Sequence, residues 1–194
     1  MITGVVLAAG ASSRMGSQKL LLPLGSETVV ARTVRQVSES GVDEVLVVVG
    51  FEHARIVAAI EGQHCRVTLN PDYATGMGSS FRTAVAALDQ SSAAMFALAD
   101  QPFVTASEYR RLIDAYREHP PGIVCARYGD VTAPPHLFDR QFFPELAGLE
   151  HGARPVLQRH RDRTVVLQLP ADMLLDIDTP EDYERAIERI SAGR

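Results

Sequence analysis

Apolar runs and amphipathic segments alternate along nearly the whole chain. The run from Val45 to Val49 contains no polar residue and is mostly β-branched, which is typical of a strand covered on both faces of a parallel sheet. Further runs that predict strands lie at 5–9, 67–69, 94–98, 123–126 and 165–167.

Segments with helical spacing of apolar residues separate these runs. Val30, Val34 and Val37 fall on one face of a helix. The spacing of Thr105 and Glu108 predicts a capping box at the start of another helix. Thr179, followed by proline and two acidic residues, predicts the start of the last helix. Two more apolar helix faces comprise Phe81, Val85 and Leu88, and Tyr109, Leu112, Ile113 and Tyr116.

This alternation predicts an α/β fold: a three-layer α/β/α sandwich with a mostly parallel sheet, in a single domain that spans residues 1–194. The region from about 128 to 160 interrupts the rhythm with two adjacent prolines and several glycines. We expect an irregular excursion there, with short helices that cover one side of a pocket. Ligands of open α/β sheets bind beyond the carboxyl ends of the strands, so the segments just after each strand are the places to look for chemistry.

Composition narrows the class of protein. Of the 194 residues, 46% are hydrophobic, which suits one compact domain with a full core. The net charge of −5 argues against a nucleic-acid binder. No apolar run approaches the roughly 20 residues that span a bilayer, and we interpret the apolar N-terminal segment as a strand, not a signal peptide. Cys65 and Cys125 stand apart, as is typical of a reducing compartment. We therefore expect a cytoplasmic protein with no nucleic-acid and no membrane partner.

A loop of small residues, 8–13, follows the first strand. Small side chains let the backbone approach a ligand closely and leave N–H groups free for phosphate oxygens. Arg14 and Lys19 supply the positive charge that a triphosphate requires. The spacing of Gly10 and Gly16 fits neither a Walker P-loop nor the dinucleotide-binding G-x-G-x-x-G. A flexible turn with two solvated cations is the alternative, but the buried strand and the two nearby cations favour phosphate binding.

The segment Leu7-Ala8-Ala9-Gly10-x-Ser12-x-Arg14-Met15-Gly16-x-x-Lys19-x-Leu21 resembles the signature of the molybdenum cofactor nucleotidyltransferases, within the wider Rossmann-like nucleotidyltransferase superfamily. Four further blocks resemble family blocks in the same order: Asn70-Pro71 with Gly76-Met77-x-Ser79-Ser80, Leu98-Ala99-Asp100-Gln101-Pro102, Gly152-Ala153-Arg154, and Asp176-Ile177-Asp178-Thr179-Pro180. The resemblance therefore covers nearly the whole chain. It implies a Rossmann-like sheet and a nucleotide site formed by Leu7, Ala8, Ala9, Gly10, Arg14, Lys19, Asn70, Ser79 and Ser80.

Some members of this set also have ordinary structural interpretations. Ser79 and Ser80 lie near the predicted start of a helix, where they would bind an anion or simply cap the helix. Asn70 precedes a proline and would fix the nucleotide or metal region, or else open a turn.

Two aspartates are the candidate metal ligands. Asp100 follows the predicted strand that ends at Leu98, and Asp178 comes from the last part of the chain. Mg²⁺ prefers one or two carboxylates together with water and substrate phosphates. The resemblance implies that Asp100 is the principal Mg²⁺ ligand and Asp178 the second, and that Arg14, Lys19 and Asp100 are the catalytic residues. Each aspartate also has an alternative interpretation. Asp100 would open a turn. Asp178 would interact with the positive end of the last helix's dipole, and Asp176 would then replace Asp178 as the second metal ligand.

The resemblance implies that Gly76, Met77 and Arg154 contact the acceptor. The sequence departs from the family pattern at Glu150, where aspartate is usual, and at 133–135, where Ala-Pro-Pro replaces a glycine-containing turn. These departures affect the identity of the acceptor more than the chemistry at the nucleotide. The histidines show no metal-ligand spacing, and we expect His136 and His151 to be surface residues in loops.

The resemblance implies transfer of a nucleoside monophosphate to the phosphate of molybdopterin, with release of pyrophosphate and Mg²⁺ as cofactor. CTP is the leading donor, because the related enzymes that transfer GMP usually have glycine at the position of Ala9. Two alternatives stay open. One is a nucleotidyltransferase for another phosphorylated acceptor such as a sugar phosphate. The other is a non-catalytic chaperone that delivers molybdenum cofactor to a molybdenum hydroxylase client, and the presence of Arg14, Lys19 and Asp100 argues against it.

Overall fold

The computed structural model describes residues 1–11, 15–119 and 122–193. In these residues, one central sheet contains seven strands in the order β5-β4-β1-β6-β8-β7-β9. The strands are β1 (Ile2–Ala8), β4 (Glu44–Val49), β5 (Arg66–Leu69), β6 (Ala93–Leu98), β7 (Ile123–Tyr128), β8 (Val131–Asp139) and β9 (Thr164–Leu169). A small separate hairpin pairs β2 (Pro23–Leu24) with β3 (Glu27–Thr28).

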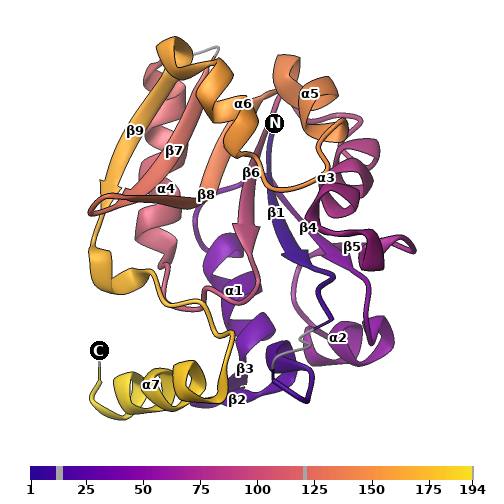
Figure 1. Cartoon of the computed structure of the whole chain (residues 1–194), viewed down its shortest axis with the longest axis vertical. Coiled ribbons are helices and arrows are strands. Elements are labelled where there is room, and N and C mark those ends of the chain that lie inside the picture. Colours follow the sequence, from indigo (N-terminus) through magenta and orange to yellow (C-terminus); the bar gives the residue numbers. More distant parts are fainter. Residues whose placement is uncertain (12–14, 120–121, 194) are drawn as a thin grey trace.

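The sheet is mostly parallel, as the sequence predicts. Strand β1 lies between β4 and β6 and is parallel to both, and β9 is parallel to β7. Only β8, among the described strands of this sheet, runs antiparallel to its neighbours. The carboxyl ends of β1 and β6 therefore meet at one edge of the sheet, which is the lower edge in Figure 1.

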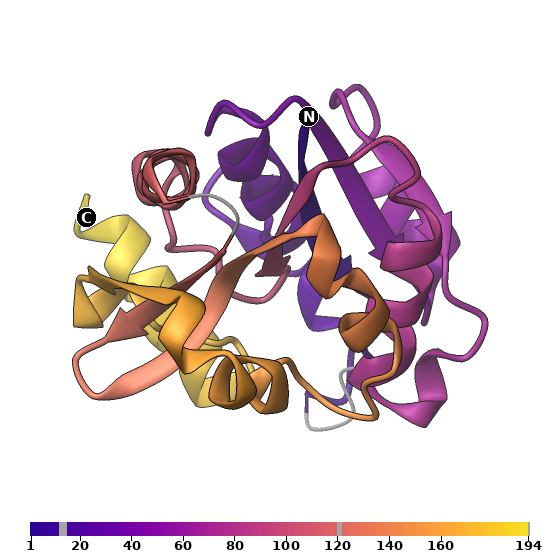
Figure 2. The same cartoon turned by 90° about the horizontal axis from the view of Figure 1, so that it is seen from above.

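Helices cover both faces of the sheet, as Figures 1 and 2 show together. The helices α1 (Val29–Ser38) and α4 (Ala106–Glu118) pack on one face. The helices α3 (Met77–Ala86), α5 (Phe143–Ala147) and α6 (Arg154–Arg159) pack on the other. The helices α2 (His53–Ala59) and α7 (Pro180–Ser191) lie toward the lower edge. Short 3-10 helices occupy Lys19–Leu21, Tyr73–Thr75, Arg140–Phe142, Arg161–Arg163 and Ala171–Met173.

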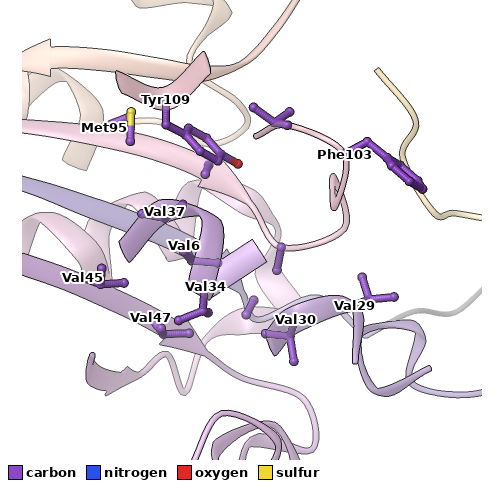
Figure 3. Close-up of a cluster of buried hydrophobic side chains, with 14 of the residues drawn as sticks. Val6, Val29, Val30, Val34, Val37, Val45, Val47, Met95, Phe103 and Tyr109 are labelled. Atoms are coloured by element: carbon purple, nitrogen blue, oxygen red, sulfur yellow. The ribbon is translucent and has the colours of Figure 1, made fainter. Parts of the chain in front are cut away.

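The buried core consists of two layers, one on each side of the sheet. Figure 3 shows one of them, where Val6 and Val47 of the sheet face Val30 and Val34 of α1. Each of these four side chains is fully buried. The predicted three-layer α/β/α sandwich is thus confirmed, in one α/β domain.

The prediction of an irregular excursion at 128–160 was wrong for its first part. The nine-residue strand β8 lies there, in the sheet between β6 and β7. Pro134 and Pro135 are the reason that β8 was not predicted. Proline cannot donate a ladder hydrogen bond, so its presence argues against a central strand. The register with β7 shifts at this point, and neither proline pairs with a residue of β6 or β7. The two prolines therefore occupy the irregular stretch of the strand. The short helices α5 and α6 follow, as expected.

The predicted helix starts had different outcomes. Thr179 accepts from the Asp182 amide and forms a complete capping box with that residue, and Pro180 is the first residue of α7. Helix α4 begins after Thr105 as predicted, but the Thr105 side chain makes no capping hydrogen bond. The side chain of Gln36 on α1 accepts from the Ala106 amide instead, at 2.7 Å. A tertiary partner thus satisfies this helix terminus, which local spacing does not reveal.

In the part of the chain that the structure describes, each helix is too short or too polar to cross a membrane. Both cysteines are free thiols; Cys125 is buried and Cys65 is half-buried. Burial raises the pKa of each thiol above its ordinary value.

Candidate active site

A cavity of about 270 Å³ lies at the carboxyl ends of β1 and β6. We call it the Lys19 cavity. The two strands contribute Leu7 and Leu98 to its wall, and the start of α3 contributes Ser80. Lys19 enters from its 3-10 helix, and Asp100 and Asp178 line the same space. Segments from both ends of the chain therefore meet where ligands of open α/β sheets bind.

The ammonium of Lys19 bridges the two aspartates. Its Nζ lies 2.5 Å from Oδ2 of Asp100 and 2.7 Å from Oδ1 of Asp178. The Lys19 side chain is only 12% exposed. Burial by itself would lower the pKa of Lys19, but the charges and hydrogen bonds of Asp100 and Asp178 outweigh it and raise the pKa above its ordinary value. Lys19 is therefore a cation in the wall of the cavity, paired with two carboxylates.

The loop after β6 holds Asp100 against the last part of the chain. The backbone amide of Ile177 donates to the Asp100 carbonyl at 3.0 Å. The buried side chain of Gln101 donates to Oδ1 of Asp176 at 2.8 Å. Burial, together with the nearby negative charges of Asp100 and Asp178, raises the pKa of Asp176 although the Gln101 hydrogen bond lowers it. Asp178, and not Asp176, lies against Lys19.

The two carboxylates fit a hard divalent cation. Oδ1 of Asp100 is buried and has no hydrogen-bond partner among the described residues, so one oxygen remains for a further cation. No group of three or more His, Cys, Asp or Glu side chains in the described ranges is arranged to hold a metal ion. A cation bound by Asp100 and Asp178 would therefore need oxygen ligands from substrates and water, which is the habit of Mg²⁺.

Hydrogen bonds hold the start of the loop that follows β1. Leu7, Ala9 and Gly10 line the Lys19 cavity, whereas Ala8 points into the core. The buried side chain of Gln18 donates to the carbonyl of Gly10 and also to that of Phe51, at 3.3 Å each. Arg14, a predicted catalytic and nucleotide-binding residue, lies outside the described residues.

Asn70 supports the cavity from behind. It is completely buried, and its Nδ2 donates to the hydroxyls of Ser79 at 2.8 Å and Ser80 at 3.1 Å. Ser80 lines the Lys19 cavity, whereas Asn70 and Ser79 do not. Ser79 instead donates to the carbonyl of Gly76 at 2.7 Å. The three residues thus form one hydrogen-bonded unit at the start of α3, with only Ser80 at the cavity surface.

The residues predicted to contact the acceptor fall in two places. Gly76 and Met77 line the Lys19 cavity, and Gly76 precedes α3 with a φ of 112°, a conformation that favours glycine. Two residues later, a Cβ on Gly78 would lie 2.1 Å from the carbonyl oxygen of Leu149, so α3 and the segment after α5 approach closely. Arg154 does not line the Lys19 cavity but belongs to a neighbouring one.

Two residues that line the Lys19 cavity, Leu20 and Tyr73, escaped the sequence analysis. Tyr73 packs against Phe51 with ring centroids 6.2 Å apart. An aromatic residue within the Asn70–Ser80 block was the available signal. The prediction for His136 was wrong, because it lies in β8 and is only 6% exposed. His151 is exposed, as expected.

The chain has relatives along most of its length. It is 31% identical to purine catabolism protein PucB of Bacillus subtilis, over 94% of both chains. It is 31% identical to nicotine blue oxidoreductase of Paenarthrobacter nicotinovorans, over 81% of this chain and 82% of the relative. It is 25% identical to the molybdenum cofactor cytidylyltransferase of Escherichia coli, over 95% of both.

Solved structures show the same architecture. Rv0371c from Mycobacterium tuberculosis superposes with a TM-score of 0.86 at 32% identity, over 96% of this chain and 97% of that one. A structure of the same protein in complex with manganese superposes with a TM-score of 0.77, over 96% and 98% of the two chains. Residues 4–178 match the family described as the MobA-like NTP transferase domain. The chain therefore belongs to this family and is a nucleotidyltransferase related to the molybdenum cofactor nucleotidyltransferases.

Proposed function

We propose that this enzyme transfers CMP from CTP to the terminal phosphate of molybdopterin and uses Mg²⁺ as its cofactor. The arrangement of Lys19 between Asp100 and Asp178 carries the proposal. Lys19 is a cation that can bind phosphate oxygens, and the two carboxylates can bind a metal ion. All three lie at the edge of the sheet where ligands bind. The similarity to the E. coli molybdenum cofactor cytidylyltransferase supports the choice of acceptor and nucleotide.

The reaction requires positioning and neutralisation of charge. An oxygen of the acceptor phosphate forms a bond to the α-phosphorus of CTP, while the bond from that phosphorus to the α,β-bridging oxygen breaks and pyrophosphate leaves. Lys19 turns from the aspartates to the phosphate oxygens as these arrive, and Arg14 supplies a second cation. Ser80 offers a hydroxyl at the cavity surface, held by Asn70. No covalent intermediate on the protein is needed.

Asp100 and Asp178 would hold the Mg²⁺. When bound, this ion neutralises negative charge that develops on the phosphate oxygens. The unpartnered Oδ1 of Asp100 supports this role, because a buried carboxylate oxygen without a partner is costly unless a ligand satisfies it. Gln101 and the Ile177 amide fix the loops that carry the two aspartates.

The preference for CTP rests on Ala9, which lines the cavity at the end of β1. A methyl group there leaves less room for a purine. Gly50 packs behind Ala9 so closely that a Cβ on Gly50 would lie 2.9 Å from the Ala9 methyl, and the Phe51 amide donates to the Ala9 carbonyl at 3.2 Å. Ala9 therefore has no room to move away from a bound nucleotide base.

The test is an assay with purified protein, Mg²⁺, molybdopterin and each of the four ribonucleoside triphosphates, in which both pyrophosphate and the dinucleotide product are measured. We expect pyrophosphate from CTP only when molybdopterin is present. Pyrophosphate release with a sugar phosphate but not with molybdopterin would identify a different acceptor. Tight binding of molybdenum cofactor with no pyrophosphate from any nucleotide would contradict the proposal and identify a chaperone for a molybdenum hydroxylase.

A further inference from the structure

Helix α1 contacts both of the segments that bring Lys19 and Asp100 into the Lys19 cavity. At the start of the helix, the Val29 amide donates to the Leu22 carbonyl at 3.1 Å, just after the 3-10 helix that begins with Lys19. Further along α1, two side chains reach the loop after β6. The helix is therefore a common support for Lys19 and Asp100, although these residues lie 81 positions apart in the chain.

Two consecutive side chains of α1 donate to carbonyl groups on either side of Asp100. The hydroxyl of Thr33 donates to the carbonyl of Ala99 at 3.1 Å, one residue before the aspartate. Nε of Arg32 donates to the carbonyl of Pro102 at 3.1 Å, two residues after the aspartate. The loop is thus fastened to α1 both before and after Asp100.

The bond between Thr33 and Ala99 is buried. Both residues are only 1% exposed, so water cannot easily replace the hydroxyl. The hydroxyl also lies 3.3 Å from the Val29 carbonyl, within its own helix. A buried carbonyl that loses its partner costs free energy, and a loop can avoid this cost by turning the carbonyl toward another donor. Loss of the Thr33 hydroxyl would therefore change the path of the loop at Ala99.

This bond fixes the peptide group that leads into Asp100. A peptide group is planar, so the direction of the Ala99 carbonyl also sets the direction of the Asp100 amide. At the next peptide group, the Asp100 carbonyl accepts from the Ile177 amide at 3.0 Å. Hydrogen bonds therefore hold both peptide planes that meet at the Cα of Asp100, and the direction of its side chain follows from these planes.

We propose that Thr33 and Arg32 are positioning residues for the divalent cation, because they fix the direction in which the Asp100 carboxylate enters the Lys19 cavity. Neither side chain lines this cavity, so both act through the backbone of the loop. The proposal rests on the proposed function, since it assumes that Asp100 binds the cation. Loss of the Thr33 hydroxyl should weaken metal binding although both aspartates are still present.

Binding of Mn²⁺ in the presence of the α,β-methylene analogue of CTP tests the proposal without turnover. Electron paramagnetic resonance measures the concentration of free Mn²⁺. Thr33→Val keeps the branched shape of the side chain but removes the hydroxyl, and we expect it to weaken Mn²⁺ binding at least about tenfold, the usual effect of losing a residue that orients a metal ligand. Thr33→Ser keeps the hydroxyl and should bind Mn²⁺ nearly as well as the wild type.

Ser40→Ala is the matched control for the loss of a buried hydroxyl. Ser40 lies beyond the last residue of α1, is fully buried, and donates to the carbonyl of Val37 at 2.7 Å. Its substitution should lower the stability in urea but leave Mn²⁺ binding unchanged. A general loss of stability would affect Ser40→Ala and Thr33→Val alike, whereas a loss of positioning affects Thr33→Val alone.

Arg32→Gln keeps the test decisive if Thr33→Val does not fold, because Arg32 is only half-buried. We expect this variant also to weaken Mn²⁺ binding. Its matched control is Arg35→Gln, since Arg35 lies on the same helix but pairs with Glu27 and Glu39 instead of the loop after β6. Arg35→Gln should bind Mn²⁺ like the wild type.

Asp100→Asn completes the set and separates this proposal from the proposed function. If Asp100→Asn loses Mn²⁺ while the folded Thr33 and Arg32 variants bind it like the wild type, the positioning proposal is overturned and the metal ligand stands. Equal losses in Thr33→Ser or in the two controls would also overturn it. If Asp100→Asn binds Mn²⁺ like the wild type, Asp100 is not a metal ligand and both proposals fail. If the variants bind as expected but the wild type transfers nothing to molybdopterin, only the proposed function fails.

Discussion

The ammonium of Lys19 lies 2.5 Å from Oδ2 of Asp100, although 81 residues separate them in the chain. The contact joins the glycine loop after β1 to the loop after β6. Parallel neighbours end at the same edge of a sheet, so the pairing of β1 with β6 brings the two loops together. The same ammonium lies 2.7 Å from Oδ1 of Asp178, and it therefore brings the two carboxylates together at one place.

Asp100→Asn should reduce transfer by at least about a hundredfold while the fold survives. The amide keeps the shape of the side chain but removes the charge that would hold Mg²⁺. Steady-state rates over a range of Mg²⁺ concentrations, with circular dichroism as a control for folding, measure this effect. Near-wild-type turnover at ordinary Mg²⁺ concentrations would show that Asp100 is not the metal ligand.

Lys19→Ala should weaken CTP binding by about 1.5–3 kcal/mol, because a charge-assisted contact to the triphosphate is lost. Lys19→Arg should restore only part of the affinity, since a planar fork replaces a mobile point charge poorly in a space bounded by two carboxylates. Isothermal titration with CTP in the presence of Mg²⁺ gives the affinities. Unchanged affinity and rate in the alanine variant would mean that Lys19 does not contact the triphosphate.

The stability of the protein should depend on pH through His136. The pKa of His136 is lowered to about 4 in the folded state because of burial, against an ordinary value of 6.5. Between these two values the unfolded chain binds a proton that the folded chain does not, so stability falls as pH decreases from 6.5 to 4. The full effect of this residue is about 3 kcal/mol.

Urea unfolding of the wild type and of His136→Gln, at pH 7.5 and at pH 4.5, isolates this contribution. We expect the variant to lose less stability on acidification than the wild type. Cys125, which pairs with His136 across β7 and β8, adds nothing in this window, because burial raises the pKa of its thiol. The same pH dependence in both proteins would show that His136 is protonated in the fold.

The strands and helices that carry the Lys19 cavity follow from the sequence because each has a clear apolar period. Val45 to Val49 is buried on both faces as predicted, and Val30, Val34 and Val37 form the buried face of α1. Strand β8 was not predicted, because Pro134 and Pro135 mimic a loop. The burial of His136 follows from β8 and was missed for the same reason.

The roles of supporting residues depend on tertiary contacts that the sequence does not reveal. Asn70 was interpreted as a residue that fixes the nucleotide or metal region or that opens a turn. Its Oδ1 accepts from the Asp72 amide at 3.0 Å, as in a turn, and its Nδ2 also holds Ser79 and Ser80 from a buried position, which the sequence does not reveal. Gln18 had no signal in the sequence, and Gln101 was seen only as one residue of a family block, with no indication that its side chain holds Asp176. The resemblance to the nucleotidyltransferases identified Asp178 as a candidate metal ligand. The local sequence explains Asp178 equally well as a residue at the start of α7.

Ala9→Gly should shift the enzyme from CTP toward GTP. Ala9 lines the Lys19 cavity, and its methyl group cannot move back because Gly50 packs directly against it. Removal of one methyl group gives a purine more room, which is worth roughly 1–3 kcal/mol in a tight pocket. We therefore expect the ratio of kcat/KM for CTP over GTP to fall in the variant, with molybdopterin as acceptor.

Ala8→Gly is the matched control for this shift. It makes the same change of side chain one residue earlier, but Ala8 points into the core and does not line the cavity. A loss of backbone rigidity would affect both variants alike, since glycine frees the chain at either position. A change of nucleotide preference confined to Ala9→Gly therefore identifies the methyl group as the selective element. If the wild type already prefers GTP, or if both variants shift equally, Ala9 does not select the base.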